Sequence, residues 1–139
     1  MVNVLYINAS DGRGGAGIGG YRSFLWIKNF AKSINIEMLV RNKYSSDPFV
    51  KEIKLSPRSC VHLAANKVAD ALKISKVSSN FQYRAKIPIS TAHIPVLDYK
   101  FFNRANYDIL NFHWIGNRVT TIEDIGRITK PIVWKLADE

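Results

Sequence analysis

Residues 10–22 read SDGRGGAGIGGYR and hold six of the chain's 8 glycines. The segment follows a short apolar run, NVLYINA at residues 3–9, which is rich in β-forming residues and is typical of a buried strand. Apolar residues then recur at helical spacing over residues 18–33. The glycines are therefore expected to form the turn between a first strand and a first helix, which is the opening unit of an α/β fold.

The same alternation of strands and helices continues along the chain. Strands are expected at residues 35–41, 107–113 and 132–136, with a weaker candidate at 87–92. Helices are expected at residues 59–76 and from a capping box, with Thr120 as N-cap and Glu123 reaching back, to about residue 128. This pattern predicts an α/β domain with a mostly parallel sheet flanked by helices.

The composition indicates one globular domain of 139 residues. Hydrophobic residues make up 47% and charged residues 22%, which is ordinary for a folded domain and argues against disorder. No apolar run approaches the ~18 residues that span a bilayer, and the first ten residues lack the features of a secretory peptide. The single cysteine, Cys60, cannot form an internal disulfide, so a cytoplasmic location is expected.

Positive charge is concentrated in the middle of the chain. The net charge is +9, and between Arg41 and Lys86 ten basic residues oppose only Asp47, Glu52 and Asp70. Such a block attracts phosphate groups, whether of an anionic membrane surface or of a nucleotide-linked substrate, but it is equally compatible with a solvated face. The basic residues lack the aromatic interleaving of a single-strand binder, so nucleic acid is not an expected partner.

The glycine-rich turn has a direct physical use. A backbone without β-carbons lets a ligand approach closely, and free N–H groups at the start of a helix favour a phosphate or carboxylate. We therefore expect Gly14, Gly15, Ala16 and Gly17 to bind an anion. The alternative is a loop that only lets the helix and the strand pack closely.

A dinucleotide site is a second possibility for this turn. The pattern G-x-G-x-x-G occurs twice, beginning at Gly12 and at Gly15. However, two residues separate the strand from the first glycine, and the second strand ends on Arg41 instead of the acidic residue that binds a ribose hydroxyl. Because an arginine could bind a 2′-phosphate, an NADP-binding Rossmann module remains an alternative.

Four segments carry a resemblance to a known family. They read VNVLYINASDGRGGAGIGGYR (2–22), MLVRNKYSSDP (38–48), NYDILNFHWIGN (106–117) and KPIVWKLADE (130–139). In this order they resemble the N-terminal half of bacterial glycosyltransferase family 4 enzymes, whose two-domain architecture is called GT-B. The resemblance is weakest over residues 45–101. It implies a Rossmann-like domain on the acceptor side of a retaining transferase that uses a nucleotide-sugar donor, in surface polysaccharide biosynthesis.

The resemblance also implies roles for particular residues. The glycine-rich turn would lie against the donor diphosphate and the acceptor. His113, Trp114 and Asp138 would bind the acceptor, since an imidazole can hydrogen-bond a sugar hydroxyl and an indole can stack on a sugar face. His113 could instead be a satisfied structural residue, and Trp114 a core residue. Neither a metal ion nor a cofactor is expected.

Two departures from the family pattern affect the expected activity. Ala137 stands where relatives usually carry a histidine before the aspartate, and the second domain, which would supply most contacts to the nucleotide sugar, is absent from these 139 residues. The isolated chain is therefore expected to be inactive as a transferase. We also expect self-association through exposed domain surfaces and peripheral contact with the cytoplasmic membrane face. A non-catalytic binding or assembly protein that kept the fold remains an alternative.

Overall fold

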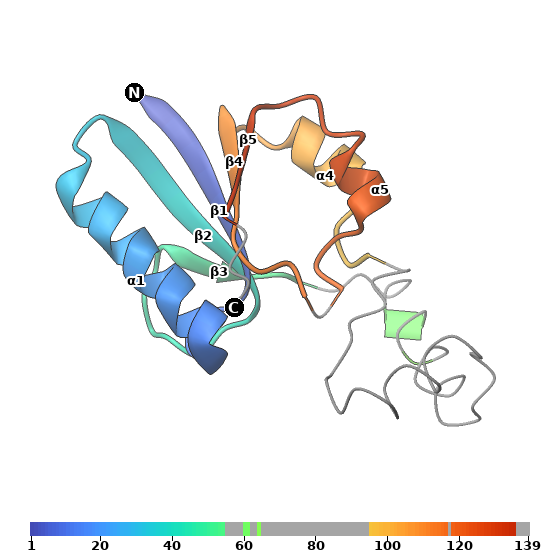
Figure 1. Cartoon of the computed structure of the whole chain (residues 1–139), viewed down its shortest axis with the longest axis horizontal. Coiled ribbons are helices and arrows are strands. Elements are labelled where there is room, and N and C mark those ends of the chain that lie inside the picture. Colours follow the sequence, from blue (N-terminus) through green and yellow to red (C-terminus); the bar gives the residue numbers. More distant parts are fainter. Residues whose placement is uncertain (55–59, 62–63, 65–94, 117, 136–139) are drawn as a thin grey trace.

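The computed structural model describes residues 1–54, 60, 61, 64, 95–116 and 118–135 (Figure 1). The strands are β1 (Val2–Ser10), β2 (Ile34–Asn42), β3 (Val50–Glu52), β4 (Ile109–Phe112) and β5 (Ile132–Trp134). The helices are α1 (Gly14–Phe30), α4 (Tyr99–Arg104) and α5 (Ile122–Ile125).

The five strands form one sheet in the order β3-β2-β1-β4-β5, and every neighbouring pair is parallel. From β1 the chain steps outward through β2 to β3, and it then returns to the other side of β1 to build β4 and β5. The strand order therefore reverses between β1 and β4. This arrangement confirms the prediction of an α/β Rossmann-like fold with a parallel sheet.

The sheet separates two apolar layers, because successive side chains of a strand point to opposite faces. Figure 1 shows α1 on one side of the sheet and α4 and α5 on the other. The layer between α1 and the sheet contains Phe24 of the helix together with Val4, Tyr6, Ile36, Met38, Val40 and Val50 of the strands. The opposite layer contains Leu5, Ile7, Ala9, Ile53, Leu97, Phe102, Leu110, Phe112 and Val119.

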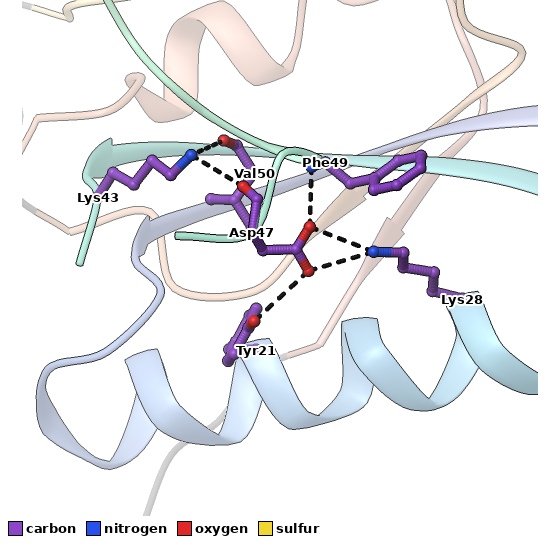
Figure 2. Close-up of polar contacts among 6 residues, drawn as sticks. All are labelled: Tyr21, Lys28, Lys43, Asp47, Phe49 and Val50. Atoms are coloured by element: carbon purple, nitrogen blue, oxygen red, sulfur yellow. Dashed lines mark hydrogen bonds and ion pairs between the residues drawn. The ribbon is translucent and has the colours of Figure 1, made fainter. Parts of the chain in front are cut away.

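The connection from β2 to β3 is attached to α1 by the partly buried carboxylate of Asp47, shown in Figure 2. Asp47 accepts hydrogen bonds from the Lys28 ammonium at 3.2 Å, from the Phe49 amide at 2.8 Å and from the Tyr21 hydroxyl at 3.5 Å. Lys43 donates to the Asp47 carbonyl at 2.8 Å. Burial alone would raise the pKa of Asp47, but the bonds from Phe49 and Lys28 lower it.

The structure corrects several predicted boundaries. The first helix begins at Gly14, four residues before the predicted start, so five of the six glycines in residues 10–22 belong to its first two turns. The strand β3 and the helix α4 were not predicted, since β3 has three residues and α4 has six, too few for a periodic pattern. Residues 60, 61 and 64 of the predicted helix are helical. The rest of that helix and the candidate strand at 87–92 lie outside the described residues.

The predicted N-cap of α5 was wrong by one residue. Thr121, not Thr120, is the cap, and its hydroxyl accepts the Asp124 amide at 3.0 Å while donating to the Asp124 carboxylate at 2.9 Å. The sequence TTIED offers a capping box in two adjacent registers, with Glu123 or Asp124 as the returning acid. The tertiary structure selects the second register, because Asp124 also accepts the Tyr99 amide at 3.2 Å.

Candidate functional site

Of the predicted site residues, the glycine-rich start of α1 and the pair His113 and Trp114 lie where the strand order reverses. β1 ends at Ser10 and leads into α1, while His113 and Trp114 directly follow the neighbouring strand β4. Both segments lie at the carboxyl edge of the sheet, because β1 and β4 are parallel. In open α/β sheets this edge, at the reversal point, is where ligands bind.

The N-terminus of α1 is open to an anion. Its N-cap, Arg13, provides no side-chain hydrogen bond to the first turn, and that turn contains no acidic residue. Gly14 has φ +69°, a left-handed conformation that favours glycine. A β-carbon added at Gly14 or Gly15 would meet no atom within 4 Å. Backbone N–H groups of the first turn of a helix lack intrahelical partners, so they are available to a charged ligand.

Two other glycines of this helix serve close packing. A β-carbon at Gly17 would lie 2.4 Å from the Ser10 hydroxyl oxygen, and one at Gly20 would lie 2.3 Å from Asn8 Nδ2. Both distances are far below normal contact, so α1 approaches β1 this closely only because these β-carbons are missing. Gly17, which we expected to bind an anion, therefore has a packing role whether or not it has a second one.

Asn8 connects the two halves of the site, although it was not among the predicted site residues. Its side chain is fully buried; Nδ2 donates to the Ala16 carbonyl at 3.2 Å, and Oδ1 accepts the amides of Ala9 at 3.0 Å and Trp114 at 3.2 Å. One carboxamide thus fixes the start of α1 against the end of β4. The available signal was a polar residue inside an otherwise apolar strand, which needs buried partners.

His113 is buried beneath α1. Its Nε2 shares a hydrogen bond with the Tyr6 hydroxyl, and its Nδ1 faces Gly20, 3.4 Å from where a β-carbon would stand. Burial, together with the positive charge of Lys135, lowers the pKa of His113. The imidazole is therefore neutral at neutral pH and mainly contacts protein. This placement matches the structural interpretation of His113 better than direct contact with a sugar.

Trp114 is the more accessible member of the pair. Its side chain is 43% exposed, so it is not the core residue that one interpretation predicted. The indole covers Gly116 so closely that a β-carbon there would lie 2.3 Å from the ring. Two hydrogen bonds hold its backbone: its amide donates to Asn8 Oδ1 at 3.2 Å, and its carbonyl accepts the Ala9 amide at 2.8 Å. The structure thus presents a positioned aromatic face at the edge of the sheet.

Asp11 holds the turn before α1 in place. Its buried carboxylate accepts the Tyr44 amide at 2.6 Å and the Ser45 amide at 2.9 Å, which joins the turn after β1 to the turn after β2. Burial alone would raise the pKa of Asp11, but the hydrogen bonds from Ser45 and Tyr44 lower it. The Arg13 guanidinium lies over the Tyr44 ring, 5.4 Å from its centre. These contacts restrict the backbone that leads to the open helix terminus.

Arg41 lies on the other face of the sheet. Its neighbour in β2, Val40, packs beneath α1, so the Arg41 side chain points to the opposite layer. Its Nη1 is buried and has no hydrogen-bond partner. Burial and the positive charge of Arg118 lower the pKa of Arg41. A bound phosphate would give Arg41 Nη1 a hydrogen-bond acceptor and would offset the positive charge of Arg118.

Asp138 and Ala137 lie outside the described residues, as does most of the basic block between Arg41 and Lys86. Within the part of the chain that the structure describes, no group of three or more metal-ligating side chains comes together.

Comparison of the chain with protein-family models, with curated proteins and with solved structures gave no match.

Proposed function

We propose that this chain is the acceptor-side domain of a retaining GT-B glycosyltransferase that uses a nucleotide-sugar donor and a saccharide or lipid-linked acceptor. One observation supports this function most directly. Asn8 joins the Ala16 carbonyl in α1 to the Trp114 amide after β4, so an uncapped helix terminus and an exposed indole share the edge where the strand order reverses.

Each part of this edge has a chemical task in glycosyl transfer. The first-turn amides of α1, around Gly14 and Gly15, would stabilise the negative charge that grows on the leaving diphosphate. Trp114 would stack on the acceptor sugar, whose hydrophobic face matches an indole. His113 would act as a positioning residue, since its hydrogen bond with Tyr6 fixes the strand end that carries Trp114.

The second domain of such an enzyme would complete the reaction. Transfer requires the donor and the acceptor to be held in line, and in a GT-B enzyme both domains contribute to that alignment. Surface polysaccharide biosynthesis remains the proposed pathway, and Asp138 the proposed third acceptor residue. Self-association also remains a prediction, although the sheet edges β3 and β5 have only three residues each and offer little backbone for pairing.

The test is a ligand titration followed by amide chemical shifts in ¹⁵N-labelled protein. We expect uridine diphosphate to shift the amides of residues 14–16, and an oligosaccharide to shift the Trp114 indole. The function would be abandoned if both ligands left these signals unchanged. A response centred on Arg41, and specific for NADP over NAD, would favour the NADP-binding alternative instead.

A matched pair of variants sharpens this test. Gly15 has open space where a side chain would stand, so Ala and Asp both fit there. Gly15→Asp places a negative charge at the helix N-terminus, which stabilises the helix but competes with a phosphate. We expect uridine diphosphate to bind Gly15→Asp about tenfold or more weakly than Gly15→Ala. Equal affinities would remove α1 from the proposed donor site.

A further inference from the structure

The outer surface of α1 is unusually apolar for a helix that covers a sheet. Trp26 is 64% exposed, Phe30 is 68% exposed and Ile18 is 43% exposed. Together with Arg22 these residues recur every four positions, so they form one continuous ridge, which we call the α1 ridge. The rings of Trp26 and Phe30 are in contact, with centroids 5.4 Å apart. The ridge extends for about 18 Å along the helix.

The charges on this helix have a single sign. α1 contains no acidic residue, while Arg22 lies exposed in the middle of the α1 ridge and Lys32 lies exposed just beyond its end. Lys28 is already paired with Asp47 at 3.2 Å on the flank of the helix. A partner that covers the α1 ridge must therefore accept aromatic side chains and supply negative charge.

These charges argue against a second copy of the chain as the partner. In a two-fold contact the same surface faces itself, so both copies of Arg22 would enter one apolar contact with no acidic residue of α1 to pair with them. Basic side chains without acidic partners are unfavourable at the centre of such a contact. A bilayer containing anionic lipid has no such conflict, because its interface accepts Trp and Phe and its headgroups attract Arg and Lys.

We propose that the α1 ridge lies on an anionic lipid surface, with Trp26, Phe30 and Ile18 entering the headgroup region and Arg22 and Lys32 contacting lipid phosphates. Among the described residues, no helix has the length and hydrophobicity to cross a bilayer. Contact would therefore be parallel to the surface, with the buried side of α1 still packed on the sheet. This assigns membrane contact to a described helix, whereas the basic block between Arg41 and Lys86 lies mostly outside the described residues.

The experiment is co-sedimentation of the full chain with vesicles of phosphatidylcholine alone or mixed with phosphatidylglycerol. We expect binding that requires phosphatidylglycerol and weakens as salt is added. The double variant Trp26→Ser with Phe30→Ser should weaken binding about tenfold or more, because both exposed rings would leave the lipid interface. Ile122→Ser is the matched control, since Ile122 is 62% exposed on α5 and lies off the ridge.

The outcomes distinguish this surface from its rivals. Binding that is absent, or that the double variant leaves unchanged, would overturn the proposal. It would also be overturned if the double variant converted a dimer to a monomer in sedimentation while wild-type protein ignored the vesicles. Circular dichroism would verify that both variants remain folded. The result does not depend on the proposed transferase function, because the vesicles carry neither sugar nor nucleotide.

Discussion

The imidazole of His113 lies against the phenol ring of Tyr6, with ring centroids 4.6 Å apart and a hydrogen bond between Nε2 and the hydroxyl. Tyr6 lies in β1 and His113 directly follows the neighbouring strand β4, and both are buried beneath α1. Burial raises the pKa of Tyr6 to about 12, although the Ser23 hydroxyl opposes this. Near neutral pH the pair is therefore uncharged, as its apolar surroundings require.

The free energy of unfolding should decrease as the pH is lowered, because His113 must then accept a proton while it is buried. The pKa of His113 is lowered from 6.5 in the folded chain by burial and by Lys135, so the unfolded chain binds the proton more readily. The stabilisation is fully present above pH 6.5 and is lost as the pH falls through the lowered pKa. Urea unfolding at pH 8, 7, 6 and 5 should show this decrease.

His113→Gln serves as the control for the other two histidines of the chain. Any pH dependence of the free energy of unfolding that wild-type protein shows and His113→Gln lacks is due to His113. If the free energy of unfolding changed equally with pH in both proteins, the buried imidazole would not be the titrating group.

Gly20→Ala should destabilise the chain by about 1–3 kcal/mol, because overpacking a closely fitted contact costs this much. The new β-carbon would stand 2.3 Å from Asn8 Nδ2, and Asn8 is fully buried with its side chain held at both ends. Gly19→Ala is the matched control in the same helix, since nothing lies within 4 Å of its β-carbon. It should stabilise the chain by about 0.5–1 kcal/mol. Thermal unfolding of both variants measures the contrast, and equal effects would disprove the close approach.

Asp11→Asn should cost about 2 kcal/mol at neutral pH, the typical strength of hydrogen bonds to a charged group. An amide side chain can accept from only one side, so one of the Tyr44 and Ser45 amides would face a second donor. Because the pKa of Asp11 is lowered from 3.8, its contribution is present above that pH and is lost below it. The difference between wild-type protein and the variant should shrink in denaturant titrations as the pH falls below 3.8.

Asp47 and Lys28 should be energetically coupled. Asp47→Ala removes the acceptor of three side-chain or backbone donors and should cost about 2 kcal/mol. Lys28→Met should cost less, because the methionine stem can still cover the Phe49 ring, over which the Lys28 ammonium lies at 3.8 Å. The double-mutant cycle should yield a coupling of about 1 kcal/mol. A coupling near zero would mean that water replaces the ion pair shown in Figure 2.

Much of the candidate site was predictable because it depends on short stretches of chain. The glycine-rich junction at residues 10–22 and the segment ending in His113 and Trp114 each carry a local pattern, and a parallel sheet places both at one edge. The connecting residue, Asn8, was missed because two of its partners, Ala16 and Trp114, lie in other segments of the chain. The inward position of His113 was also unpredictable, since it follows from how closely α1 approaches β1.

The sequence by itself determined the alternation of strands and helices, and with it the parallel α/β class, because hydrophobic period and glycine placement are local properties. It also determined the single sign of charge along α1. Only the tertiary structure decided which glycines of α1 face open space and which lie against β1. It also selected Thr121 as the cap of α5, and it left Trp26 and Phe30 uncovered. These outcomes depend on contacts between residues far apart in the chain, which no local pattern encodes.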